Sequence, residues 1–82
     1  MASQNTWDRL QMLVVDFFRV EPEEVGPEMR FRLDLGADSL TFAEFLMVIE
    51  DTFEVKISDH MGDGIQTLAD ARDCIESLRR TA

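Results

Sequence analysis

The residues of this chain best suited to chemistry lie in one heptapeptide, Asp34-Leu35-Gly36-Ala37-Asp38-Ser39-Leu40. Ser39 follows a glycine-containing loop and precedes a strongly apolar stretch, so the pattern places it at the start of a helix. The backbone N–H groups and the positive dipole end of such a terminus favour a phosphate group. We therefore expect Ser39 to present its hydroxyl as a point of phosphate attachment.

Other roles for Ser39 follow from its neighbours. Ser39 could itself cap the helix, or Asp38 could be the cap and leave Ser39 in the first turn with its hydroxyl outward. A hydrolase nucleophile elbow needs glycines on both sides of the serine, whereas Leu40 and Thr41 follow Ser39. His60, the single histidine, would have to act as the base without an evident orienting group. We therefore predict that the chain is not an enzyme.

Length and composition favour one folded domain over residues 1–82. The chain has 82 residues, of which 45% are hydrophobic, and its formal net charge is −9. The apolar residues are clustered, which favours a packed core over disorder. The negative charge disfavours nucleic acids and anionic membrane surfaces as partners, and it favours basic protein surfaces.

The acidic residues are concentrated after the heptapeptide begins. Eight acids and one base, Lys56, lie between Asp34 and Asp63.

Cys74 is the single cysteine, so no internal disulfide can form, as suits a reducing compartment. The longest apolar run, Phe45 to Ile49, is far too short to span a bilayer. We expect a cytoplasmic monomer.

Four helices are expected from apolar spacing and capping residues. The first starts at Asn5 or Thr6 and ends near Val20. A long loop, 21–38, follows, and its apolar residues should anchor it to the core. The second helix covers about 39–53, a short third is capped by Ser58 or Asp59, and Thr67 caps the last. The fold class is therefore all-α: a small four-helix bundle with a long loop between the first and second helices. The anchoring residues of that loop are Phe31, Leu33 and Leu35.

The second helix carries more apolar residues than one buried face needs. One stripe should form the core: Phe42, Phe45, Leu46, Ile49 and Phe53. A second, narrower stripe beside acidic residues predicts a surface for a protein partner. We call this surface the predicted docking face; its residues are Leu40, Ala43, Glu44, Met47, Glu50 and Asp51.

A calcium loop is the weaker interpretation of the acids near the third helix. The first, fifth, sixth and twelfth positions of a twelve-residue loop are matched by Asp59, Asp63, Gly64 and Asp70. However, Met61 occupies a position that needs an oxygen ligand, and the last position prefers glutamate. We predict no specific metal site and expect divalent cations to screen these charges loosely.

The order of motifs resembles bacterial acyl carrier proteins of the fatty-acid and polyketide type over nearly the whole chain. The heptapeptide carries the likeness, and the segments Glu23-Glu24-Val25 and Phe53-Glu54-Val55-Lys56-Ile57 extend it. Several residues depart from the usual family pattern, so a carrier specialised for another acyl pathway is open beside the housekeeping one. These departures are Leu33, Thr41, Phe42, Phe45, Met61, Gly62 and Gly64.

The resemblance implies a covalent 4′-phosphopantetheine on Ser39, with acyl groups carried as thioesters on its terminal sulfur. Asp34 and Gly36 would shape the loop, while Asp38 and Leu40 would frame the serine for a phosphopantetheinyl transferase. Other implied partners are acyl-transferring and chain-elongating enzymes with basic docking surfaces. The alternative is an acidic helical adaptor without a prosthetic group.

A carrier of this kind could shelter its acyl chain between the second helix and the helices after it, because apolar surface left in water is unfavourable. Because the Phe45 side chain takes up space there, we expect the cavity to be shallow, or to be closed before an acyl chain is attached. The expected walls are Phe45, Leu46, Ile49, Met61, Ile65, Ala71 and Ile75.

Overall fold

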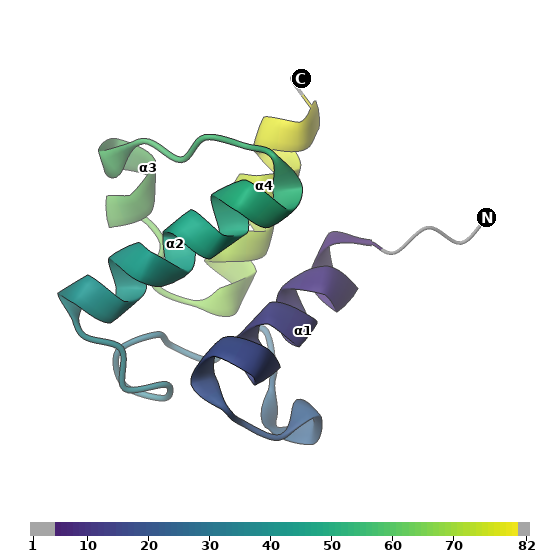
Figure 1. Ribbon diagram of the computed structural model, residues 1–82, viewed down its shortest axis with the longest axis vertical. Helices are drawn as coiled ribbons and strands as arrows, with labels where there is room; N and C mark the ends of the chain where they lie inside the picture. The colour runs from purple at the N-terminus through teal and green to yellow at the C-terminus, as the bar shows by residue number, and fades with distance from the viewer. Residues whose placement is uncertain (1–4, 81–82) are drawn as a thin grey trace.

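The structure is a computed structural model and describes residues 5–80. Figure 1 shows the long helices α1 (Thr6–Phe18), α2 (Ser39–Phe53) and α4 (Leu68–Arg80). The short helix α3 (Asp59–Asp63) follows α2 and precedes α4 along the chain. A single 3-10 turn, η1 (Pro22–Glu24), lies in the loop after α1. The part of the chain that the structure describes contains no strand. The predicted all-α bundle with a long first loop is therefore confirmed.

The helices begin at the polar residues that the sequence suggested. Asn5 accepts a hydrogen bond from the Asp8 N–H at 2.8 Å, and Ser58 Oγ accepts one from the Met61 N–H at 3.1 Å. Thr67 Oγ1 accepts from the Asp70 N–H at 3.1 Å. Each bond satisfies an N–H group that has no partner within its own helix.

The first helix ends earlier than expected. It stops at Phe18 rather than near Val20, because Arg19 adopts a left-handed backbone with a φ of 60°. The Arg19 N–H closes the last turn on the Val15 carbonyl at 3.0 Å. This left-handed C-cap ends the helix three residues ahead of Pro22.

The core lies where α1, α2 and α4 meet. Each of these helices contributes side chains without solvent exposure: Leu10, Val14, Phe45, Ile49, Leu68, Ala71 and Ile75. Phe45 is at the centre, with its ring centroid 5.2 Å from those of both Phe17 and Phe18. Burying rings in edge-on or tilted contact stabilises the fold beyond the burial of their area alone.

The long loop is held by backbone hydrogen bonds to the start of α4 and to the residues just before it. The Phe31 N–H donates to the Gln66 carbonyl at 3.0 Å, and the Leu68 N–H donates to the Met29 carbonyl at 3.0 Å. Phe31 is buried and Leu35 packs against the core, as predicted. The prediction was wrong for Leu33, which is 73% exposed because it lies on the outside of the tight turn that follows Arg30.

Candidate functional site

Ser39 is the first residue of α2, and its side chain is exposed. Asp38, not Ser39, is the cap: its Oδ1 accepts a hydrogen bond from the Thr41 N–H at 2.8 Å. The capping role is therefore filled by the neighbour, and the Ser39 hydroxyl is left on the surface of the first turn. This arrangement is the second of the two that the sequence allowed.

The turn before Ser39 depends on Asp34 and Gly36. Asp34 Oδ2 accepts from the Arg30 N–H at 2.7 Å and from the Arg30 guanidinium at 3.2 Å. Gly36 has a φ of 70°, a backbone conformation that side-chain-bearing residues rarely adopt. Together they reverse the chain so that Ala37 is buried and the next residues reach the start of α2.

Hydrogen bonding to the backbone keeps these carboxylates charged. The Arg30 N–H, followed by its guanidinium, lowers the pKa of Asp34 below its usual value. The Thr41 N–H lowers the pKa of Asp38 in the same way. Both residues therefore act as anionic structural acceptors around Ser39, and neither is poised to exchange a proton near neutral pH.

Arg32 is a site residue that the sequence analysis did not identify. Its Nη2 donates a hydrogen bond to Ser39 Oγ at 3.4 Å. An arginine seven positions before the serine was visible in the sequence, but only the turn around Asp34 brings the two side chains together. A guanidinium beside a hydroxyl supplies positive charge for a phosphate group attached there.

An open hollow of about 640 Å³ lies beside Ser39. Its lining contains four charged side chains, those of Arg30, Arg32, Asp38 and Asp63. The apolar part of the lining comes from Phe31, Leu33, Phe42 and Ile65. We call this feature the Ser39 hollow. Its mixed lining suits a ligand with an anionic end at Ser39 and an apolar remainder.

The expected acyl-cavity walls occupy several environments. Four of them, Phe45, Ile49, Ala71 and Ile75, have no exposed surface and are part of the closed core. Leu46 packs at the edge of that core, and Met61 is 39% exposed. Ile65 alone among these residues lines the Ser39 hollow. A cavity along the predicted walls would therefore require the core to open.

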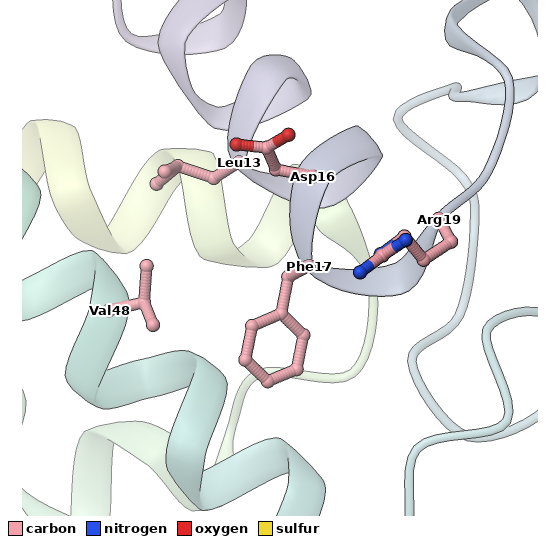
Figure 2. A pocket seen from close by; sticks show the side chains of 5 residues that line it. All are labelled: Leu13, Asp16, Phe17, Arg19 and Val48. Carbon is pink, nitrogen blue, oxygen red and sulfur yellow. The ribbon is translucent and has the colours of Figure 1, made fainter.

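A second hollow of about 530 Å³ lies between α1 and α2, as Figure 2 shows. It is lined by Leu13, Asp16, Phe17, Arg19 and Val48 and shares no lining residue with the Ser39 hollow. The Arg19 and Asp16 side chains lie at its margin, and its walls are apolar. Nothing in it places a nucleophile near a base, so it adds no chemistry to Ser39.

The predicted docking face is exposed at most of its positions. Leu40 is 69% and Met47 is 64% exposed, and Ala43, Glu44 and Asp51 are exposed as well. Glu50 differs, because it is half-buried and its Oε2 accepts a hydrogen bond from the Ile57 N–H at 2.7 Å. This carboxylate holds the chain that leaves α2, a role that the sequence analysis did not foresee.

The calcium-loop interpretation is not supported by the side chains. Asp70 Oδ2 accepts from the Gln66 and Thr67 N–H groups at 3.0 and 3.1 Å, so it caps α4. Among residues 5–80 no group of three potential metal-binding side chains is found. Within the same range, no helix is long and apolar enough to cross a membrane.

Cys74 lies on α4 and is half-buried rather than fully enclosed. It packs against the core, and burial raises the pKa of its thiol. The protonated thiol is therefore the dominant form near neutral pH, consistent with a structural residue. Trp7 likewise packs against the core from α1.

A comparison with protein families matches residues 8–75 to the model of the phosphopantetheine attachment site. The matched range includes all of α2 and α3 and the turn that leads to Ser39. Members of this family are carrier domains that are modified by phosphopantetheinyl transferases and that interact with acyl-handling enzymes. The chain therefore belongs to the phosphopantetheine attachment site family, which is defined by a 4′-phosphopantetheine prosthetic group attached to a serine.

Proposed function

We propose that this protein is an acyl carrier and that Ser39 is its attachment residue. The observation that carries the proposal is the exposed Ser39 hydroxyl at the start of α2, with Asp38 as the cap and Arg32 beside it. Within residues 5–80 the other serines lack this setting: Ser58 is occupied as the cap of α3, and Ser77 lies within α4.

The residues around Ser39 fit a phosphodiester. The first turn of α2 offers backbone N–H groups and a positive dipole end, and Arg32 adds a full positive charge. Exposed Leu40 gives a transferase an apolar contact next to the hydroxyl. The prosthetic group, once attached, supplies a thiol that holds an acyl group as a thioester. The residues around Ser39 bind the phosphate end of the prosthetic group and leave its thiol end accessible to partner enzymes.

Partner enzymes would recognise the predicted docking face on α2. Its exposed acids attract basic surfaces and accelerate encounter, while Leu40 and Met47 provide apolar contact that prolongs the complex. We further propose that the partners belong to fatty-acid or polyketide biosynthesis, with acyl-transferring and chain-elongating enzymes among them, and that the carrier works in the cytoplasm as a monomer.

The acyl chain would begin at the Ser39 hollow and not in the closed core. Phe31, Leu33, Phe42 and Ile65 provide apolar surface there without rearrangement. A longer chain would need α3 to move away from α2, which would open the walls formed by core residues. Thermal unfolding of the carrier loaded with a series of chain lengths should show stabilisation that rises over the first carbons and then levels off. A flat response would mean that the chain stays in solvent.

Intact-mass measurement tests the attachment directly. The protein is incubated with coenzyme A and a phosphopantetheinyl transferase, and its mass should increase by one phosphopantetheinyl group. Ser39→Ala should abolish the increase, whereas Ser77→Ala, a serine on the surface of α4, should retain it. No increase with several active transferases would contradict the carrier and favour the acidic adaptor. An increase that survives Ser39→Ala would place the attachment elsewhere.

A further inference from the structure

Arg32 places a guanidinium at the hydroxyl of Ser39. The hydrogen bond from Arg32 Nη2 to Ser39 Oγ is long, at 3.4 Å. Its neighbour Arg30 is engaged differently, since Arg30 Nε pairs with Asp34 Oδ2 at 3.2 Å. In the described range 5–80, Arg32 makes no ion pair. Its charge is thus available at the oxygen where a phosphate ester would form.

The Ser39 hollow already contains two carboxylates. Asp38 and Asp63 both line the hollow, and hydrogen bonding to the Thr41 N–H lowers the pKa of Asp38 and keeps it anionic. A phosphodiester on Ser39 would add a further negative charge beside these carboxylates, at a cost in repulsion. Of the two arginines in the lining, Arg30 is already paired, and Arg32 is the one that can offset the new charge.

We propose that Arg32 binds the phosphodiester of the prosthetic group and sets the direction in which the arm leaves Ser39. The inference rests on the proposed attachment at Ser39. In a phosphodiester the phosphorus would be bonded to Ser39 Oγ, and the free phosphate oxygens would lie two bonds beyond that atom. The Arg32 guanidinium would then exchange its weak contact with Oγ for a charge-assisted hydrogen bond. Its planar fork matches two phosphate oxygens, which a lysine ammonium cannot match in the same geometry.

This ion pair also connects two elements. Arg32 belongs to the turn in the long loop, whereas Ser39 belongs to α2. Tying the phosphate to the loop directs the root of the arm across the Ser39 hollow, toward Leu33 and Ile65. Because exposed ion pairs add little to global stability, the effect should be seen at the phosphate itself and not in the unfolding free energy.

Phosphorus NMR of the modified protein tests the contact, since the phosphodiester is its only phosphorus. Four proteins are compared after mass spectrometry has shown complete modification: wild type, Arg32→Gln, Arg32→Lys and Arg80→Gln. Arg80 is exposed in the last turn of α4 and controls for the loss of one positive charge. We expect Arg32→Gln to shift and narrow the phosphorus signal, Arg32→Lys to restore it in part, and Arg80→Gln to leave it unchanged. Added salt should move the wild-type signal toward that of Arg32→Gln.

A second measurement follows the Arg32 side chain itself by proton–nitrogen NMR. It uses Arg32→Gln only to assign the Arg32 Nε–H resonance. The Nε–H resonance of Arg32 in the wild-type protein should shift when the unmodified chain is converted to the modified one. If all four proteins are modified and their phosphorus signals coincide, or if Arg80→Gln shifts the signal as Arg32→Gln does, the role of Arg32 is overturned and the carrier proposal stands. An absence of modification in wild type overturns both proposals.

Discussion

Asp38 contributes both to the local structure of α2 and to the exposure of the Ser39 hydroxyl. Its carboxylate caps α2, and by doing so it leaves the Ser39 hydroxyl outside the helix. Backbone N–H donors lower the pKa values of Asp34, Asp38 and Asp70, because each bond favours the charged form. A group whose pKa is lower in the folded state stabilises the fold above its unfolded-state pKa. That contribution is lost as the pH falls through the folded-state pKa.

Asp38→Asn tests this linkage, because the amide keeps an acceptor for the Thr41 N–H but does not titrate in the acid range. We expect the variant to be less stable than wild type near neutral pH. The difference should close as the pH falls below the usual aspartate range of about 4. Urea unfolding at a series of pH values measures both quantities. A stability difference that is unchanged at acid pH would contradict the role assigned to the Asp38 charge.

Helix α2 carries two glutamates with different roles. Glu44 is exposed on the predicted docking face, whereas Glu50 holds the Ile57 N–H at 2.7 Å. Charge reversal at the two positions should therefore have separable effects. Glu50→Lys should lower the unfolding free energy by about 1 kcal/mol or more, since a partly buried N–H loses its acceptor. Glu44→Lys should change it little, and should instead slow association with a transferase and weaken the salt dependence of that rate.

Urea unfolding and stopped-flow binding of the two variants provide the comparison. Equal losses of stability would show that the bond from Ile57 to Glu50 does not support the connection after α2. Association rates that are unchanged in Glu44→Lys would move the docking surface away from this part of the helix.

The short helix α3 contains Gly62 and ends at its C-cap, Gly64, and these two glycines have different surroundings. A Cβ added at Gly62 would lie 3.1 Å from Leu46 Cδ1, so the absence of a side chain lets α3 approach α2. At Gly64 the nearest atom to an added Cβ is the Met61 carbonyl oxygen at 3.6 Å, and φ is −87°. Gly64→Ala should therefore raise stability by about 0.4–1 kcal/mol, because it restricts the unfolded chain.

Gly62→Leu should have the opposite effect, since the added side chain must displace α3 or Leu46. It should also shorten the range of acyl chains that stabilise the carrier, because the new side chain would occupy part of the Ser39 hollow. Thermal unfolding of the unloaded and loaded variants measures both effects. A Gly62→Leu protein as stable as Gly64→Ala would show that α3 is not held closely against α2.

At the scale of the whole molecule, a net charge of −9 on 82 residues repels itself. Magnesium, calcium or moderate sodium chloride should therefore raise the melting temperature by screening, without saturating at one site. Asp59→Asn combined with Asp63→Asn should melt higher and respond less to cations. Isothermal titration provides the check: a stoichiometric calcium isotherm that is lost on Asp63→Asn would favour the calcium loop over diffuse screening.

Features with local causes could be predicted from the amino-acid sequence. The sequence identified Thr67 as the cap of α4 and left the cap of α2 open between Ser39 and Asp38. Both observed caps bond an N–H three residues along the chain, which is why the helix starts could be placed from local sequence. The positions of the apolar residues then fixed which helices share a core, so the fold class and the place of Ser39 followed. The end of α1 was placed two residues late, because the left-handed conformation of Arg19 has no strong signal in its residue type.

Contacts between side chains of different segments depend on the tertiary structure. Arg32 meets Ser39 only because the turn around Asp34 folds the loop back, and Glu50 meets Ile57 only because the chain reverses after α2. Apolar spacing also could not distinguish Leu33, which is exposed, from Phe31, which is buried two residues earlier. Such outcomes depend on how helices rotate and on the path of a loop. Helical periodicity constrains the rotation of a helix only coarsely, and the composition of a loop does not specify its path.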